Sequence, residues 1–152
     1  ISAAGREKAS RLAARFGVHI DYQVADYESA RIDTGAYDAI ALIFAHIHES
    51  HRRSAHRRLA SALASGGRLI LEAYSKEQLA YGTGGPPAEQ LLYAVDDLRE
   101  DFADLEVLQL EKIEAEIHEG QYHSGLASVI RLIAVRNPSA ARADFGPVSP
   151  HS

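Results

Sequence analysis

The sequence contains no cysteine among its 152 residues. This absence excludes disulfide bonds, thiolate metal ligands and a cysteine nucleophile. No apolar run approaches the roughly 20 residues that a membrane-spanning helix needs, and no signal peptide is visible. We therefore expect a cytoplasmic protein without a membrane partner.

An excess of basic residues is also lacking, because the formal net charge is −5. This balance excludes the electrostatic footprint of a nucleic-acid-binding protein, so we expect no nucleic acid partner. The basic stretch RRSAHRR at residues 52–58 has helical spacing and is interpreted as the solvated face of a helix. The length allows one domain with a real core.

The hydrophobic pattern predicts an α/β chain with a mostly parallel sheet and a closing antiparallel hairpin. Helices are expected at residues 2–16, 49–67 and 94–104. Strands are expected at residues 18–26, 37–44, 68–74, 105–120 and 124–136, the last two forming the hairpin. Residues 137–152 lack periodicity and are expected to form a disordered tail.

Five segments resemble the class I S-adenosylmethionine-dependent methyltransferases, in particular their small bacterial tellurite-resistance-like branch. They are VAD (24–26), YDAIALIFAHI (37–47), LASGGRLILEAYSKEQL (63–79), GTGGPP (82–87) and HEGQYHSG (118–125). The resemblance implies a Rossmann-like methyltransferase sheet, the cofactor S-adenosylmethionine and a small-molecule methyl acceptor. It covers residues 1–136, which we expect to form a truncated methyltransferase-like domain.

The resemblance also implies which residues hold the cofactor. Asp26, with Ala25 beside it, matches the position whose carboxylate accepts a hydrogen bond from the adenine amino group. Phe44, Ala45 and His46 match the end of the family's fourth strand and would line the methionine part of the cofactor. This placement agrees with the rule that ligands of open α/β sheets bind at the carboxyl ends of the strands.

The sequence departs from the family at its front. Such a methyltransferase begins with a strand, a glycine-rich turn and a second strand with an acidic end, whereas the match here begins at ISAAGREKA. The family's first two strands, which lie at the centre of its sheet, are therefore missing. We expect these residues to be part of a longer protein, with a new strand pairing or a homodimer as the alternatives.

The loop GTGGPP does not predict a phosphate site, because no Lys followed by Ser or Thr opens a helix after it. Two interpretations remain open, a substrate-contacting loop and a structural connection. The first would place Gly82, Gly84 and Gly85 in the substrate site.

Tyr74 and His123 are the candidate catalytic residues, and both, with Tyr122, are candidate substrate ligands. Glu72 is a comparable candidate, while the residues near 118–123 also suit an exposed hairpin tip. His46, His48, His51 and His56 fall within a short stretch, but no ligand spacing completes a set, so we expect no metal.

Two functions follow from this sequence. One is methyl transfer from S-adenosylmethionine to a small molecule. The alternative is a truncated methyltransferase-like module without cofactor binding, which acts as an oligomeric binding or structural protein.

Overall fold

The computed structural model describes residues 3–27, 30–118 and 124–138. The chain divides into two compact units, Ile1–Ile32 and Asp33–Ser152, which are described separately. None of the helices in the described ranges is long and apolar enough to cross a membrane. Part of the predicted tail, residues 139–152, and the candidate residues Tyr122 and His123 lie outside the described residues.

The first unit contains helix α1, Ala3–Phe16, which confirms the predicted helix. Gly17 follows with a positive φ of 63°, and its amide donates to the carbonyl of Ala14. The predicted strand at 18–26 is wrong, because this segment forms no strand in the structure. A strand requires a neighbouring backbone to pair with, and none of the described residues supplies a ladder here.

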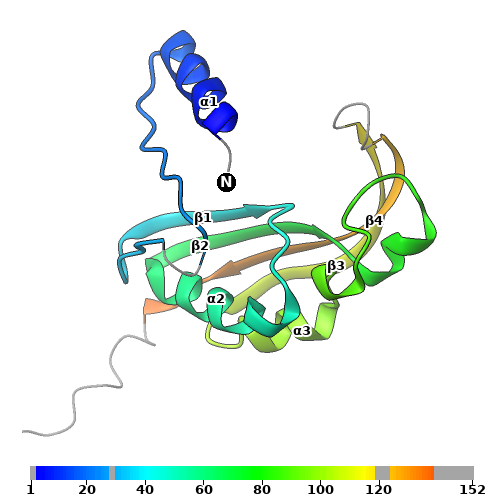
Figure 1. Ribbon diagram of the computed structural model, residues 1–152. Coiled ribbons are helices and arrows are strands. Elements are labelled where there is room, and N and C mark those ends of the chain that lie inside the picture. The colour runs from blue at the N-terminus through cyan, green and yellow to red at the C-terminus, as the bar shows by residue number, and fades with distance from the viewer. Residues whose placement is uncertain (1–2, 28–29, 119–123, 139–152) are drawn as a thin grey trace, which may run out of the picture. The chain divides into compact units, whose positions relative to one another are not determined.

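The second unit is built on a mixed sheet, and most of its helices and strands correspond to predicted ones. Along the described chain they are β1 Tyr37–Ile43, α2 Glu49–Ala62, β2 Leu63–Tyr74, the 3₁₀ turns η1 Lys76–Ala80 and η2 Glu89–Leu91, α3 Val95–Asp101, β3 Glu106–His118 and β4 Ser124–Val135. The strand order is β1-β2-β4-β3 (Figure 1). β1 and β2 are parallel, while β2 with β4 and β3 with β4 are antiparallel. The α/β class and the C-terminal hairpin are confirmed, whereas the sheet is mixed and not mostly parallel, because β1 with β2 is the one parallel pair among the described strands.

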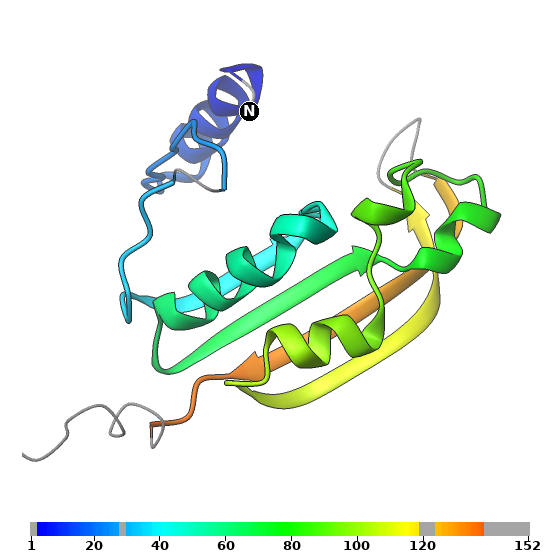
Figure 2. The same cartoon turned by 60° about the horizontal axis from the view of Figure 1, so that its bottom comes forward.

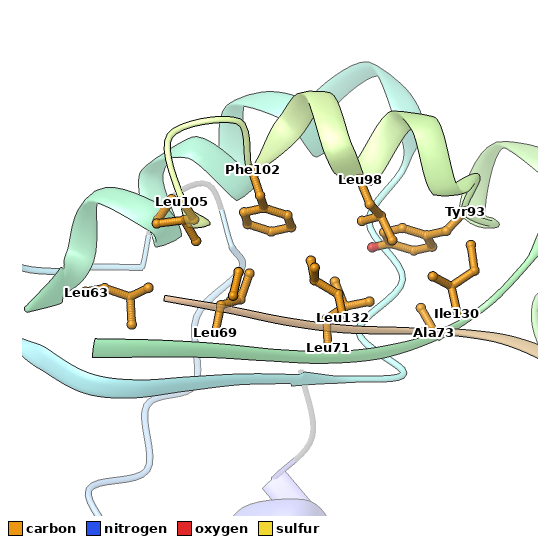
Figure 3. Close-up of a cluster of buried hydrophobic side chains, with 12 residues drawn as sticks. Leu63, Leu69, Leu71, Ala73, Tyr93, Leu98, Phe102, Leu105, Ile130 and Leu132 are labelled. Carbon is orange, nitrogen blue, oxygen red and sulfur yellow. The ribbon is translucent and has the colours of Figure 1, made fainter. Parts of the chain in front are cut away.

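The two helices of this unit, α2 and α3, lie on the same face of the sheet (Figure 2). Alternate residues of β2 and β4 point to that face and are buried with side chains of α3 (Figure 3). This core comprises Leu69, Leu71 and Ala73 of β2, Ile130, Leu132 and Ala134 of β4, and Leu98 of α3 with Phe102 directly after it. Burying a Leu or Ile side chain stabilises the fold by about 1.5–3 kcal/mol.

The connection from α2 into β2 depends on a close approach of backbone atoms. A Cβ on Gly67 would lie 2.9 Å from the carbonyl oxygens of Ala64 and Tyr37, so only glycine fits. Arg136, directly after β4, closes the same corner by donating to the carbonyl oxygen of Leu63 at 2.9 Å and to that of Ser61. These bonds satisfy carbonyls at the C-terminal end of α2.

Candidate cofactor and substrate site

The candidate site lies where the parallel strands β1 and β2 end. Phe44 directly follows β1, and Tyr74 is the last residue of β2. The rings of Phe44 and Tyr74 are 4.7 Å apart between centroids. The imidazole of His46 stacks on Tyr74, with centroids 5.5 Å apart and planes 9° apart. Three of the residues selected from the sequence are thus brought together at the carboxyl edge of the sheet, where ligands of open α/β sheets bind.

Phe44 has an unusual backbone conformation, with a φ of +49°. Positive φ is uncommon for any residue with a Cβ and strained for a bulky one, and such residues cluster at functional sites. The amide of Phe44 donates to the carbonyl of Glu72 at 2.8 Å, so β2 holds the turn in place. The chain leaves β1 through this turn and continues into Ala45 and His46.

The segment around Tyr93 fixes the rest of this turn. The hydroxyl of Tyr93 donates to the carbonyl of Ala45 at 2.8 Å and accepts from the amide of Ile47 at 3.3 Å. Tyr93 is 1% exposed, and burial raises the pKa of its phenol, while the bond from the Ile47 amide and the charge of Arg52 oppose the rise. The protonated hydroxyl therefore remains available as a donor to Ala45.

Arg52 contacts both Tyr93 and the turn at residues 44–47. Its Nε donates to the carbonyl of Ile47 at 3.1 Å, and its Nη2 donates to that of Gln90 at 2.8 Å. Its Cζ lies 4.1 Å from the centroid of the Tyr93 ring, a cation–π contact. The interpretation of residues 52–58 as a solvated face is wrong for Arg52 and His56, which are 3% and 0% exposed.

His46 carries an acceptor atom that lacks a partner. Its Nδ1 lies 2.9 Å from the carbonyl oxygen of Leu91, and because a carbonyl only accepts, Nδ1 carries the proton. Its Nε2 is buried and has no hydrogen-bond partner among the described residues. Burial lowers the pKa of His46, the Leu91 bond opposes this and the charge of Arg52 adds to it, so the ring is neutral near pH 7.

The other histidines of the sequence cluster have separate structural roles. His48 caps α2, its Nδ1 accepting from the amide of Ser50 at 3.3 Å. His56 lies in the core, where its Nδ1 is 2.9 Å from Oδ2 of Asp101 and its ring stacks on Phe102. In the described part of the chain, no three His, Asp or Glu side chains are grouped so that they could hold a metal ion.

The loop after η1 is shaped by Gln78, which is 2% exposed. Its Nε2 donates to Oγ1 of Thr83 and to the carbonyl of Gly84, both at 3.0 Å, while its Oε1 accepts from the amide of Ser128 at 2.8 Å. The loop is thereby tied to β4. It lines an open pocket of about 420 Å³ with Gln78, Leu79, Gly82, Gly84, Gly85, Pro86 and Pro87.

Gly85 connects this loop to the candidate site. Its φ is +88°, and a Cβ there would lie 3.0 Å from the Tyr74 ring, so the glycine lets the loop rest on Tyr74. The three predicted loop glycines therefore lie at a pocket wall, with Gly85 next to the aromatic residues. Whether they contact a substrate stays a prediction.

The remaining candidates are placed differently. Glu72 is held by Arg131, whose Nε donates to Glu72 Oε2 at 2.9 Å. Ala25 and Asp26 lie in the first unit, in an exposed segment without regular secondary structure, where the carbonyl of Asp26 accepts from the amide of Ala30 at 2.9 Å. Their contact with adenine stays a prediction.

Sequence reasoning missed Arg52, Gln78 and Tyr93. For Arg52 a signal existed, because Ala55, three residues later, and His56, four residues later, share its helical face. The other two lie in short turns whose positions depend on contacts far along the chain, and periodicity carries no signal for them.

No family model matches the sequence, and a search of curated proteins returns no match. Solved structures do match. TehB from Haemophilus influenzae superposes with a TM-score of 0.71 at 16% identity, over 90% of this chain and 48% of TehB. The N-methyltransferase NodS from Bradyrhizobium japonicum gives a TM-score of 0.58 at 15% identity, over 84% of this chain and 67% of NodS.

A SAM-dependent methyltransferase from Methanosarcina mazei gives a TM-score of 0.61 at 12% identity, over 90% of this chain and 79% of the enzyme. At these identities the likeness shows the fold alone. The chain therefore has a Rossmann-like fold shared with methyltransferases, and it spans about half the length of TehB.

The described residues of the second unit suit one end of S-adenosylmethionine. Phe44 and His46 are half-buried aromatic rings of the kind that attract a sulfonium cation, whereas Tyr74 is 2% exposed and packs against both of them. The strained turn presents backbone at the carboxyl edge. The predicted adenine ligand, Asp26, belongs to the first unit. Contact of Phe44, Ala45 and His46 with the methionine end of the cofactor stays a prediction.

Proposed function

We propose that the protein transfers a methyl group from S-adenosylmethionine to a small-molecule acceptor at the carboxyl ends of β1 and β2. The observation that carries this proposal is the cluster of Phe44, His46 and Tyr74 on a strained turn, in a fold shared with methyltransferases. When bound, the cofactor supplies a methyl group already activated by its sulfonium centre.

Because that methyl group is already activated, the chain mainly has to bind and orient. Tyr93 and Arg52 hold the 44–47 turn, so the ring of His46 and the backbone of Ala45 keep fixed positions. Tyr74 forms a floor between the turn and Gly85.

Calorimetric titration of the 152-residue chain with S-adenosylhomocysteine tests the proposal. We expect saturable binding that Phe44→Ala weakens about fivefold, because one aromatic contact with a cation or thioether is worth about 1 kcal/mol. Phe16→Ala is the matched control, since Phe16 is 67% exposed in the first unit and should leave the affinity unchanged. Asp26→Ala should weaken binding severalfold if Asp26 holds adenine.

A second candidate function is favoured by the edge of the sheet. β1 pairs with β2 on one side and ends the sheet of the described residues on the other. Ile43, in this edge strand, is 53% exposed. An open apolar edge favours pairing with another chain, so this candidate is a methyltransferase-like module that assembles as a homodimer without cofactor.

The same titration separates the two functions when it is combined with sedimentation equilibrium. Binding of S-adenosylhomocysteine supports the enzyme. A folded dimer that gives no heat with S-adenosylhomocysteine supports the module and contradicts the enzyme.

A further inference from the structure

The open pocket in the loop after η1, called the loop pocket below, has a lining that restricts what it can bind. Its volume of about 420 Å³ falls within the range of about 300–1,000 Å³ of small-molecule sites. Glycines, prolines, a leucine and a glutamine line it, so none of the described lining side chains is ionisable. An ion that enters the loop pocket would lose water without gaining a charged partner, which disfavours charged ligands.

The polar side chain of the lining, Gln78, is already committed to the protein. Both hydrogens of its Nε2 are used, by Oγ1 of Thr83 and by the carbonyl of Gly84, each at 3.0 Å. Its Oε1 accepts from the amide of Ser128 at 2.8 Å. The side chain of Gln78 therefore shapes the wall of the loop pocket but offers no N–H donor to a carboxylate or phosphate.

Apolar surface is left open in the loop pocket. Leu79 of η1 is 48% exposed, Pro87 is exposed and Pro86 is half-buried. A ligand seated against these side chains would remove their surface from water, which is favourable for apolar groups. The lining thus favours an apolar ligand by what it exposes as well as by the charges that it lacks.

The charged residues next to the lining are paired with one another. Nζ of Lys76 lies 3.5 Å from Oε1 of Glu89, and Glu77 pairs with Lys112 of β3. The hydrogen bond from Lys112 lowers the pKa of Glu77 to about 2, so Glu77 is ionised near pH 7. Because each pair joins one positive and one negative charge, neither supplies an uncompensated charge that would attract an ion.

Gly85 connects the loop pocket to the candidate methyl-transfer site. A Cβ at this glycine would lie 3.0 Å from the ring of Tyr74, which packs against Phe44 and His46. We propose that the loop pocket selects an uncharged, apolar ligand, and that this ligand is the methyl acceptor. The ligand's role as acceptor rests on the proposed function, whereas its selection requires only the chain and the ligand.

Three probes with the same carbon skeleton test this selection without cofactor. They are cyclohexylmethanol, cyclohexanecarboxylate and cyclohexylmethylammonium, which are neutral, anionic and cationic near pH 7. A ¹H–¹⁵N NMR titration of the 152-residue chain follows the backbone amides of residues 78, 79 and 82–85. We expect the alcohol to shift these amides and to bind at least about fivefold more tightly than either ion, because an ion loses its hydration here without gaining a partner.

Charged variants of Leu79 show whether the lining sets the preference. Leu79→Asp should reverse the order of affinities in favour of the ammonium probe, and Leu79→Lys should reverse it in favour of the carboxylate probe, because each places one charge in the lining. Leu108→Asp is the matched control, since Leu108 of β3 is 55% exposed and does not line the loop pocket. It should retain the wild-type order.

Three results would overturn the inference. They are binding of either ion as tightly as the alcohol, no shift at residues 78–85 with any of the three probes, and an unchanged order of affinities in both Leu79 variants. None of these depends on S-adenosylhomocysteine, so they remain distinct from failure of the proposed function, which shows as absent cofactor binding. Selective binding of the alcohol together with absent cofactor binding would retain the selection by the loop pocket and reject the ligand's role as methyl acceptor.

Discussion

Asp101 is a buried carboxylate in the described core. Its side chain is 4% exposed and lies 2.9 Å from Nδ1 of His56 and 3.1 Å from Nε of Arg53. Burial by itself would raise the pKa of Asp101, but the hydrogen bonds from His56 and Arg53 outweigh it and lower the pKa below the ordinary value of 3.8. Through these bonds Asp101, the last residue of α3, connects α3 to α2.

The sign of the pH dependence follows from this lowered pKa. A carboxyl group with a lower pKa in the folded state stabilises the fold above its unfolded pKa, and this contribution is lost as the pH falls through the folded value. Asp101→Asn should therefore lower the free energy of unfolding by about 1–3 kcal/mol at pH 7. Its deficit relative to wild type should shrink below about pH 4.

Urea unfolding of both proteins between pH 7 and pH 3 measures this difference. Asp96→Asn serves as the control, because Asp96 is 87% exposed and pairs with Arg99 at the surface, where such pairs contribute about 0–1 kcal/mol. A deficit for Asp101→Asn that stays constant over the whole pH range would contradict a lowered pKa of Asp101 in the folded protein.

At the scale of elements, the loop after η1 depends on one side chain. Gln78→Ala removes the bonds to Thr83 and Gly84 and leaves the amide of Ser128 without its acceptor. We expect a loss of about 1–3 kcal/mol in the free energy of unfolding. Amide hydrogen exchange should also accelerate at residues 83–85, because the bond from Thr83 Oγ1 to the carbonyl of Leu126 then remains as a side-chain attachment of the loop to β4 without the support of Gln78.

Gln109→Ala is the matched control for this loop. Gln109 is an exposed residue of β3 whose amide reaches the side chain of Glu111. The substitution should change stability by less than about 0.5 kcal/mol. If Gln78→Ala and Gln109→Ala changed the free energy of unfolding equally little, the hydrogen bonds of Gln78 would not stabilise the loop, and other contacts would hold it.

The elements that the sequence predicts well are those whose pattern is local. The run at 37–44 and the alternation at 105–120 and 124–136 correspond to β1, β3 and β4, because a continuous or alternating row of apolar residues is a local pattern. The apolar run does not make β1 a buried strand, since its residues are exposed or half-buried. The helix expected at 49–67 ends at Ala62, since β2 begins at Leu63 and continues through the glycines.

The strand predicted at 18–26 shows the limit of such patterns. Its alternation of Val18, Ile20, Tyr22 and Val24 is as regular as that of β3, yet these side chains are 40–56% exposed. Alternation states which face can be buried but does not supply a partner strand. In the candidate site, the same limit applies to Tyr93, whose contact with Ala45 spans 48 residues of sequence.

At the scale of the whole molecule, the fold is similar to that of TehB, but the match covers only 48% of TehB. The second unit nevertheless contains a complete parallel pair, β1 and β2, and the strained turn that follows it. We therefore predict that the cofactor contacts this turn.

The measurement that tests this claim most directly is a ¹H–¹⁵N NMR titration with S-adenosylhomocysteine, compared with adenosine alone. We predict that S-adenosylhomocysteine produces its largest amide shifts at residues 44–47 and 91–93, and that adenosine leaves residues 44–47 unshifted. Shifts that avoid both segments, or that are the same with adenosine, would contradict a methionine-end site at the carboxyl ends of β1 and β2.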